Sequence, residues 1–358
     1  MTRHTILTTA LLLALCGVGG ALAQVLHLPM PWMIGALIMS GVCIVLAARA
    51  ERFESYSFPL PLRTAFIGMI GVMIGGQATP ELLRQMTQLP VTLAALVLFI
   101  GIAHAGNVVI FRRIGKFDAA TAFYSGTPGG LMESILLGEA AGADARILTL
   151  QQFLRIILVV TLVPLGLSLW LGHPVGSAAG DMGQISGDTA TLPELILVAA
   201  AGAAGLGLAR LVRLPAGHLT GPLLLTAGLS LSGVVTLHVP FWLIALAQVV
   251  VGASLGLRFK GVSLALLRRS VGLTALSVTF MLALGMGISL VLVHLTDIPF
   301  LHLLISFAPG GVTEMSIIAL SLAANPALVT LHHVLRILLT VMELTLVTKL
   351  RPQMAGPR

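Results

Sequence analysis

The chain has 358 residues, of which 57% are hydrophobic and only 9% are charged, and its mean hydropathy is +1.03. A typical soluble domain has about 25% charged residues, so this composition excludes an ordinary soluble protein and predicts a polytopic membrane protein. The net charge of +7 does not indicate nucleic acid binding, because the basic residues lie in short loops between apolar runs. There is also no zinc-ligand spacing and no soluble helix-turn-helix segment.

The apolar runs predict five transmembrane spans in each half of the chain. Those of the first half cover residues 5–23, 31–48, 62–76, 90–111 and 147–170. Those of the second half cover residues 194–209, 217–236, 240–257, 270–293 and 327–348. The first run also has the pattern of a cleaved signal peptide. We expect it to be retained, because it has a mid-chain counterpart in which Leu208 and Ala209 match Leu22 and Ala23.

The two halves are related by an internal duplication. Gly71 and Gly75 of the first half match Gly252 and Gly256 of the second, with the same spacing in each pair. We therefore expect a first membrane repeat over residues 1–171 and a second over residues 193–350. The linker at 172–192 has Gly, Ser and Asp but no Lys or Arg, which predicts a flexible periplasmic loop. Residues 351–358 would form a cytoplasmic tail.

A nine-residue motif occurs in both halves, and its two copies are offset by the same interval as the matched glycines. It reads Ser-Gly-Thr-Pro-Gly-Gly-Leu-Met-Glu at 125–133 and Ser-Phe-Ala-Pro-Gly-Gly-Val-Thr-Glu at 306–314. Proline removes a backbone donor and the two glycines remove the conformational bias toward helix, so each Pro-Gly-Gly predicts a break in a helix. A break at membrane depth has to be compensated by the protein, which marks both motifs as candidate functional sites.

The distribution of Lys and Arg predicts the orientation of the chain. If neither Pro-Gly-Gly segment crosses the membrane, every Lys and Arg is cytoplasmic except Arg84, Arg155 and Arg336. If both segments crossed, seven basic residues of the loops between 146 and 269 would join Arg84 outside, which the positive-inside rule disfavours. Five spans per repeat invert the second repeat relative to the first. We therefore predict an all-α polytopic membrane protein with two inverted-topology repeats, each with a broken or re-entrant Pro-Gly-Gly helix.

The candidate substrate site lies at the two motifs. Each downstream half-helix exposes backbone N–H groups at its N-terminus, which attract an anion or a carboxylate. The structural alternative is a buried kink closed by protein contacts. The residues of this candidate site are Thr127, Pro128, Gly129 and Gly130 in the first copy and Ala308, Pro309, Gly310 and Gly311 in the second.

Each motif ends in a glutamate, Glu133 or Glu314, and an arginine, Arg155 or Arg336, follows it at the same interval in both copies. An ionised group within a span costs roughly 2.5–3.5 kcal/mol on insertion scales and is a functional candidate. The glutamates could carry a coupling proton, or they could simply cap their own half-helices. A Glu133–Arg155 and a Glu314–Arg336 pair would serve as a clamp or as a gate.

One turn before each arginine lies a pair of polar residues, Gln151 and Gln152 in the first copy and His332 and His333 in the second. With the arginines they are candidates for gating or proton relay. A metal site is disfavoured, because no further ligands accompany the histidines at metal spacing. Secondary candidates to line the site are His104, Asn107 and Glu343. We expect no cofactor.

The segment Leu28–Ala36, the two Pro-Gly-Gly-x-x-Glu motifs and the duplication resemble the bacterial AbrB-type family of integral membrane proteins. The resemblance covers nearly the whole chain and implies two copies of a membrane domain. Members carry the labels regulator of gene expression and ammonia monooxygenase. Nothing in the chain resembles the small soluble DNA-binding protein that shares the name. The second copy departs from the first where Ala216-Gly217-His218 replaces Met30-Pro31-Trp32, so the halves are not chemically equivalent.

The sequence favours a secondary transporter or channel of the inner membrane for a small anionic or ammonium-like solute, with both termini cytoplasmic. A membrane-embedded regulator that acts indirectly on gene expression is the alternative. An oxygenase is less favoured, because the intramembrane histidines are few, so we expect no enzyme. The expected partners are the lipid bilayer and a small solute or ion, without direct nucleic acid binding. The oligomeric state stays open, and a homo-oligomer is among the alternatives.

Overall fold

The computed structural model describes residues 3–47, 56–78, 85, 87–173, 175, 191–214, 216–233, 240–259, 264–322 and 324–350. Within these ranges every regular element is a helix. The predicted periplasmic linker falls mostly outside the described residues, and the predicted cytoplasmic tail at 351–358 falls wholly outside them.

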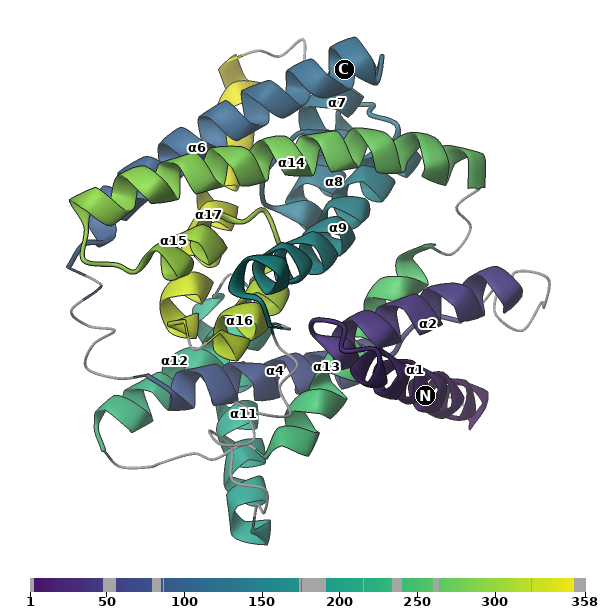
Figure 1. The fold of residues 1–358 in the computed structure, drawn as a ribbon, viewed down its shortest axis with the longest axis vertical. Coiled ribbons are helices and arrows are strands. Elements are labelled where there is room, and N and C mark those ends of the chain that lie inside the picture. Colours follow the sequence, from purple (N-terminus) through teal and green to yellow (C-terminus); the bar gives the residue numbers. More distant parts are fainter. Residues whose placement is uncertain are drawn as a thin grey trace. The chain divides into compact units, whose positions relative to one another are not determined.

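The helices gather into two compact units that each draw on both halves of the chain (Figure 1). Unit 1 comprises residues 1–82, 161–261 and 316–327, and unit 2 comprises residues 83–160, 262–315 and 328–358. The predicted repeats, 1–171 and 193–350, are therefore not the compact bodies of the fold, because helices of one half pack on helices of the other.

Within the described residues, unit 1 contains six complete α-helices, a short 3-10 segment and the C-terminal parts of α9 (Ala145–Leu171) and α16 (Val312–Ser321). The complete elements are α1 (Arg3–Val25), α2 (Pro31–Ala47), α4 (Leu60–Gly76), α11 (Leu192–Val212), α12 (Gly217–Leu231), α13 (Phe241–Gly256) and η2 (Leu257–Phe259). Helices α1 and α2 form a pair that packs on α13, and α11 and α12 form a pair that packs on α4. Each pair thus rests on a helix from the other half of the chain.

Glycines allow these helices to approach closely, as small residues do in membrane helix pairs. Gly71 and Gly75 of α4 lie against the backbone of α12, and Gly252 and Gly256 of α13 lie in the same way against α2. A Cβ at any of the four would collide with backbone atoms. The glycines matched by the duplication are therefore the contact points between the two halves.

Buried hydroxyl groups reinforce the same two contacts. Ser40 Oγ of α2 donates to the Ala253 carbonyl oxygen of α13 at 2.8 Å, and Thr226 Oγ1 of α12 lies 3.2 Å from the Val72 carbonyl oxygen of α4. Hydroxyls are suited to this position because they bond across helices without adding a charge to an apolar interior.

Unit 2 contains the two Pro-Gly-Gly motifs. Its elements are α6 (Leu89–Val109), the π-helical segment η1 (Ile110–Ile114), α7 (Ala119–Ser125), α8 (Leu131–Ala140), most of α9 (Ala145–Leu171), α14 (Leu264–Leu295), α15 (Phe300–Phe307), the first part of α16 (Val312–Ser321) and most of α17 (Pro326–Leu350). Figure 1 shows α6 and α14 running alongside each other. Between them, Ser277 Oγ donates to Asn107 Oδ1 at 2.7 Å.

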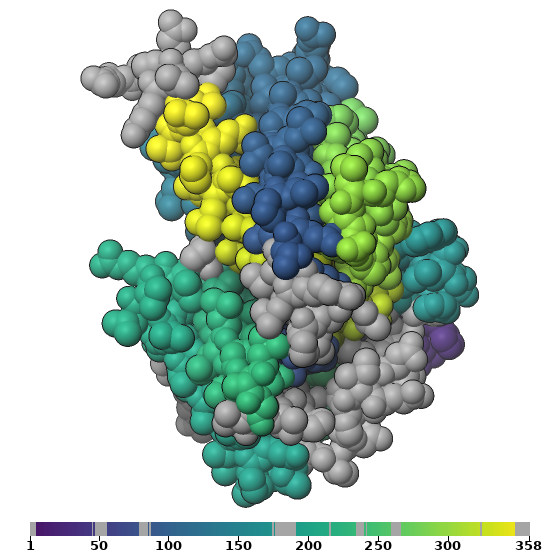
Figure 2. Space-filling view, turned by 90° about the vertical axis from the view of Figure 1, so that its left-hand side faces the viewer, coloured from purple at the N-terminus to yellow at the C-terminus, as the bar shows by residue number. Residues whose placement is uncertain are grey.

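The outer face of unit 2 is apolar. Figure 2 shows α17 in yellow, α6 in blue and α14 in light green beside one another on one face. These helices expose large hydrophobic side chains, among them Leu98, Val109, Val291, Met342 and Leu346. A surface of this kind suits lipid rather than water.

Among the residues that the structure describes, six helical segments are long and apolar enough to cross a membrane, as a polytopic membrane protein requires. They match six of the predicted spans: 5–23, 90–111, 147–170, 194–209, 270–293 and 327–348. The other four predicted spans correspond to shorter helices, α2, α4, α12 and α13, with 17, 17, 15 and 16 residues. Helix α12 ends at Leu231 rather than at the predicted residue 236.

Candidate functional site

Both Pro-Gly-Gly interruptions lie in unit 2, each between the end of one helix and the start of the next. Helix α7 ends at Ser125 and α8 begins at Leu131, so residues 126–130 form the first interruption. Helix α15 ends at Phe307 and α16 begins at Val312, so residues 308–311 form the second. Gly130 adopts a left-handed conformation, with φ of 59°, which lets the chain turn sharply into α8.

Arg336 binds the backbone of the second interruption. Its side chain is 2% exposed. Nη1 donates to the Ala308 carbonyl oxygen and Nη2 donates to the Gly310 carbonyl oxygen, each at 2.6 Å. A helix that stops inside the protein leaves carbonyl groups without partners, and the planar guanidinium fork can satisfy two of them at once.

Arg155 has the equivalent role at the first interruption. Its side chain is 6% exposed, and Nη1 donates to the Thr127 carbonyl oxygen. The pairs Arg155–Thr127 and Arg336–Ala308 have the same sequence separation of 28 residues. The duplicated sequence thus builds the same arginine-to-carbonyl contact twice.

The expected Glu133–Arg155 and Glu314–Arg336 pairs are wrong, because both arginines bond to backbone carbonyls instead. The glutamates turn back toward their own half-helices. The Oε2 atom of Glu133 would lie 3.6 Å from a Cβ placed on Gly130, and the carboxylate of Glu314 lies directly over Gly311. A carboxylate is stabilised near the N–H groups and the positive dipole end of a helix. This placement fits the capping alternative.

A hydrogen-bonded cluster surrounds the first interruption. Gln152 Nε2 donates to Thr127 Oγ1 at 2.8 Å and to the Tyr124 carbonyl oxygen at 3.0 Å. The hydroxyls of Thr127 and Ser134 are 2.7 Å apart. Gln151 instead accepts a hydrogen bond from Thr274 of α14. The two predicted glutamines therefore face different neighbours, and only Gln152 bonds to the motif.

The two predicted histidines make the same contact with one ring nitrogen and have different neighbours otherwise. In each, Nδ1 lies 2.9 Å from a carbonyl oxygen one turn earlier, on Leu328 for His332 and on Val329 for His333, so Nδ1 carries the proton. His332 Nε2 lies 2.9 Å from Thr92 Oγ1. His333 is buried and, besides Val329, interacts with the backbone of Ala308 in the second interruption.

Several buried polar atoms near the interruptions have no hydrogen-bond partner within the described ranges. In native proteins most such atoms are paired, so a cluster of exceptions suggests water or ligand. Both donors and acceptors are among them. They are Ser125 Oγ, Gln151 Nε2, Gln152 Oε1 and Arg155 Nε from the first half, and Arg336 Nε and Thr340 Oγ1 from the second.

Helix α17 brings the two interruptions together. A Cβ on Gly129 would lie 3.0 Å from Thr340 Oγ1 and 3.4 Å from Arg336 Cγ. The stem of Arg336 thus lies beside the first interruption while its guanidinium binds the second. Arg155 and Arg336 lie close enough for their positive charges to repel each other.

The secondary candidates also lie in this part of unit 2. Asn107 Nδ2 donates to the Gly126 carbonyl oxygen at 3.0 Å. His104 Nε2 lies 2.9 Å from the Phe123 carbonyl oxygen, and its Nδ1 lies 2.9 Å from Glu343 Oε1. Since a carbonyl oxygen can only accept, His104 Nε2 is the donor in the bond to Phe123.

Sequence reasoning missed four side chains of this region: Ser125, Ser134, Thr274 and Thr340. Thr340 follows Arg336 by one helical turn and so shares its helix face, a spacing that could have identified it. Ser125 begins the repeated motif and has its match in Ser306, a signal that could have identified it as well. Ser134 and Thr274 are single hydroxyls of the kind that most often bond to their own helix, and no sequence signal distinguishes them.

A family model described as "Transition state regulatory protein AbrB" matches residues 40–351. This covers most of the chain. The protein belongs to the AbrB family. It is 28% identical to the "Putative regulator AbrB" of Escherichia coli (strain K12) over 317 residues, 87% of each chain. It is also 26% identical to the "Uncharacterized protein YhjN" of Bacillus subtilis (strain 168) over 345 residues, 92% of this chain and 89% of the relative. No solved structure matches this AbrB-family chain.

Proposed function

We propose that this AbrB-family protein is a secondary transporter for a small anionic solute, with its substrate site at the two Pro-Gly-Gly interruptions of unit 2. The observation that carries the proposal is the pair of buried guanidinium groups of Arg155 and Arg336, which bond to carbonyls and retain unpartnered Nε atoms among the described residues. An ammonium-like solute would meet two positive charges of its own sign at short range. An anion would offset them.

The proposed architecture is a pair of inverted repeats whose Pro-Gly-Gly segments are re-entrant. The positive-inside rule supports it, because the basic residues then gather on the cytoplasmic side. The matched contacts of Arg155 and Arg336 also support it, since each repeat would supply one half of a central site. The protein would lie in the bacterial inner membrane with both termini cytoplasmic and with no direct contact to nucleic acid.

The placement of the glutamates supports a coupling mechanism. Glu314 lies over Gly311 at the start of α16, and Glu133 turns toward Gly130 at the start of α8. An anionic solute would seek the same helix N-termini. Protonation would remove the negative charge of the resident carboxylate from the start of the helix, and the anionic solute would then take its place. One proton would therefore enter with each solute charge, which keeps the buried region close to neutral.

A membrane-embedded regulator is the second candidate, because the Escherichia coli relative has the printed name of a regulator. In this case the chain would alter gene expression indirectly, by sensing or moving an effector. We propose no enzymatic role. The two adjacent histidines of α17 both use Nδ1 to bond to backbone carbonyls, which supports a structural or gating role for them.

The test is uptake into liposomes that contain the purified full-length protein, with small carboxylates, inorganic anions and methylammonium as solutes and a pH-sensitive dye inside. We expect uptake of an anion together with protons. Glu314→Gln should retain anion exchange and lose proton movement, whereas Arg336→Lys should lose uptake. Glu139→Gln changes an exposed carboxylate of the same half-helix as Glu133 and should behave as the unmodified protein.

Two results would separate the candidates. Uptake of methylammonium without any anion would contradict the role given to the arginines. Absence of transport for every solute, together with an unchanged effect on gene expression in the Arg336→Lys strain, would favour the regulator.

A further inference from the structure

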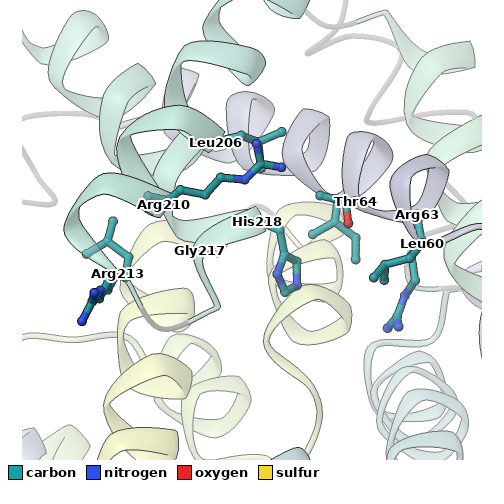
Figure 3. Close-up of a pocket in the computed structure, with 11 residues that line it drawn as sticks. Leu60, Arg63, Thr64, Leu206, Arg210, Arg213, Gly217 and His218 are labelled. Atoms are coloured by element: carbon teal, nitrogen blue, oxygen red, sulfur yellow. The ribbon is translucent and has the colours of Figure 1, made fainter.

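A basic pocket in unit 1 lies outside the site described above. It is formed by the N-terminal end of α4, the C-terminal end of α11 and the N-terminal end of α12, and it has a volume of about 530 Å³ (Figure 3). Its base is apolar, with Ile67, Leu206 and Ala209. A pocket of this size fits the range typical of small-molecule sites.

Four basic side chains line this pocket: Arg63, Arg210, Arg213 and His218. Figure 3 shows Arg63, His218 and Arg213 pointing the same way, with Arg210 reaching toward Leu206. Thr64 supplies a hydroxyl group among them. No acidic side chain is among the described residues that line the pocket, so its charge is of one sign.

The positive charge is not offset nearby within the described part of unit 1. Glu194 is the acidic residue described there, and it belongs to the capping box that begins α11. Arg210 lies near the opposite end of the same helix, about 24 Å away at the α-helical rise. Arg63 Nε is buried and has no hydrogen-bond partner among the described residues. A second pocket, of about 330 Å³, shares Arg63 and adds Arg258, whose charge repels that of Arg63.

We propose that this basic pocket binds the phosphate group of an anionic phospholipid. Arginine forks match phosphate oxygens, and the pocket receives the positive end of the α12 dipole as well. The arginines of α11 lie at the end of an apolar helix long enough to span a membrane, Leu192–Val212. A phosphate is found at this depth of a bilayer, in the headgroup layer.

The surroundings of the pocket favour a lipid over free phosphate. Leu60 is 68% exposed beside Arg63, and Leu211 is 82% exposed between Arg210 and Arg213. Exposed leucines beside arginines provide an apolar surface for acyl chains next to a charged surface for the headgroup. A soluble phosphate would use only the charged part.

The experiment measures the thermal unfolding of the purified full-length protein in a neutral detergent, titrated with palmitoyl-oleoyl-phosphatidylglycerol, with the matching phosphatidylcholine, or with inorganic phosphate. We expect phosphatidylglycerol to raise the melting temperature and the other two to leave it within error. The variant Arg63→Gln/Arg213→Gln should require ~10-fold more phosphatidylglycerol for the same shift, which corresponds to about 1.4 kcal/mol.

Matched variants make the result specific. Arg112→Gln/Arg113→Gln removes the same number of charges from η1 in unit 2, where both arginines are exposed, and should keep the full response. The single variant Arg213→Gln, at an exposed position, should fold and should show an intermediate loss. An equal response to phosphatidylcholine would overturn the proposal, as would an undiminished response of the double variant. A shift with inorganic phosphate alone would keep the anion site and refute the lipid.

Discussion

Replacing Arg336 by methionine should destabilise the protein by about 3–6 kcal/mol, because it removes two hydrogen bonds to a charged group, each worth about 1.5–3 kcal/mol. The guanidinium of Arg336 satisfies two buried carbonyl groups, on Ala308 and Gly310. That of Arg155 satisfies one, on Thr127, so Arg155→Met should cost about half as much. Methionine keeps most of the apolar stem, so the difference between the variants reports the lost bonds rather than a cavity.

The two arginines should also be coupled. Because their charges repel each other, each single variant already relieves this repulsion in full, and the double variant should cost more than the sum of the single variants. The assay is unfolding in detergent at several denaturant concentrations, followed by circular dichroism and tryptophan fluorescence. Arg336→Lys should recover part of the loss, since an ammonium can donate to one of the two carbonyls. Equal losses for Arg155→Met and Arg336→Met would refute the assignment of two carbonyls to Arg336.

Three further changes have expected results. Gly129→Ala should lower stability by about 1–2 kcal/mol through overpacking against Thr340, and adding Thr340→Ala should recover part of it in the same unfolding assay. Gly252→Ala should destabilise unit 1, because the added Cβ would collide with the α2 backbone. The control Gly101→Ala has open space around the added Cβ and should be neutral or stabilising by up to ~1 kcal/mol. The melting temperatures of the two variants test this difference. Asp118 accepts a hydrogen bond from the Thr121 N–H at the start of α7, so Asp118→Ala should cost about 1 kcal/mol and Asp118→Asn much less.

The pH dependence of the Asp118 cap follows from the direction of its pKa. Burial alone would raise the pKa of this carboxyl, but hydrogen bonds from Thr121 and neighbouring backbone groups together hold it below its ordinary value. A carboxyl with a lowered pKa in the folded state stabilises the fold above its unfolded pKa, about 3.9. This contribution should disappear as the pH falls through the lower folded value. The Asp118→Asn variant should show no such loss over the same acid range.

The sequence predicted the six long spans because each is a continuous apolar run, a pattern that depends on the bilayer and not on neighbouring helices. The other four predicted spans stand as shorter helices. Helix α12 stops at Leu231, before the predicted residue 236, and Gly233 just beyond its end has a φ of 70°, which suits the end of a helix. The division into compact units was not predictable, because a duplication in sequence does not say whether each copy packs on itself.

The candidate site residues stay a prediction, and two of the contacts expected among them are wrong. Arg155 and Arg336 stood out because a charge in an apolar run needs a partner. Glutamates at the same spacing in both halves suggested ion pairs. The actual partners are backbone carbonyl groups, which every residue has and which no sequence pattern marks. Glu133 and Glu314 have a nearer favourable position, at the beginning of their own half-helices, because third-position carboxylates turn back toward free N–H groups.

The packing of unit 1 has a consequence for how the chain is assembled. Helix α2 packs against Gly252 and Gly256 of α13, a helix in the other half of the chain. During synthesis the first half therefore enters the bilayer with this face uncovered until the second half follows. Two separately expressed halves of this protein should accordingly assemble in one membrane.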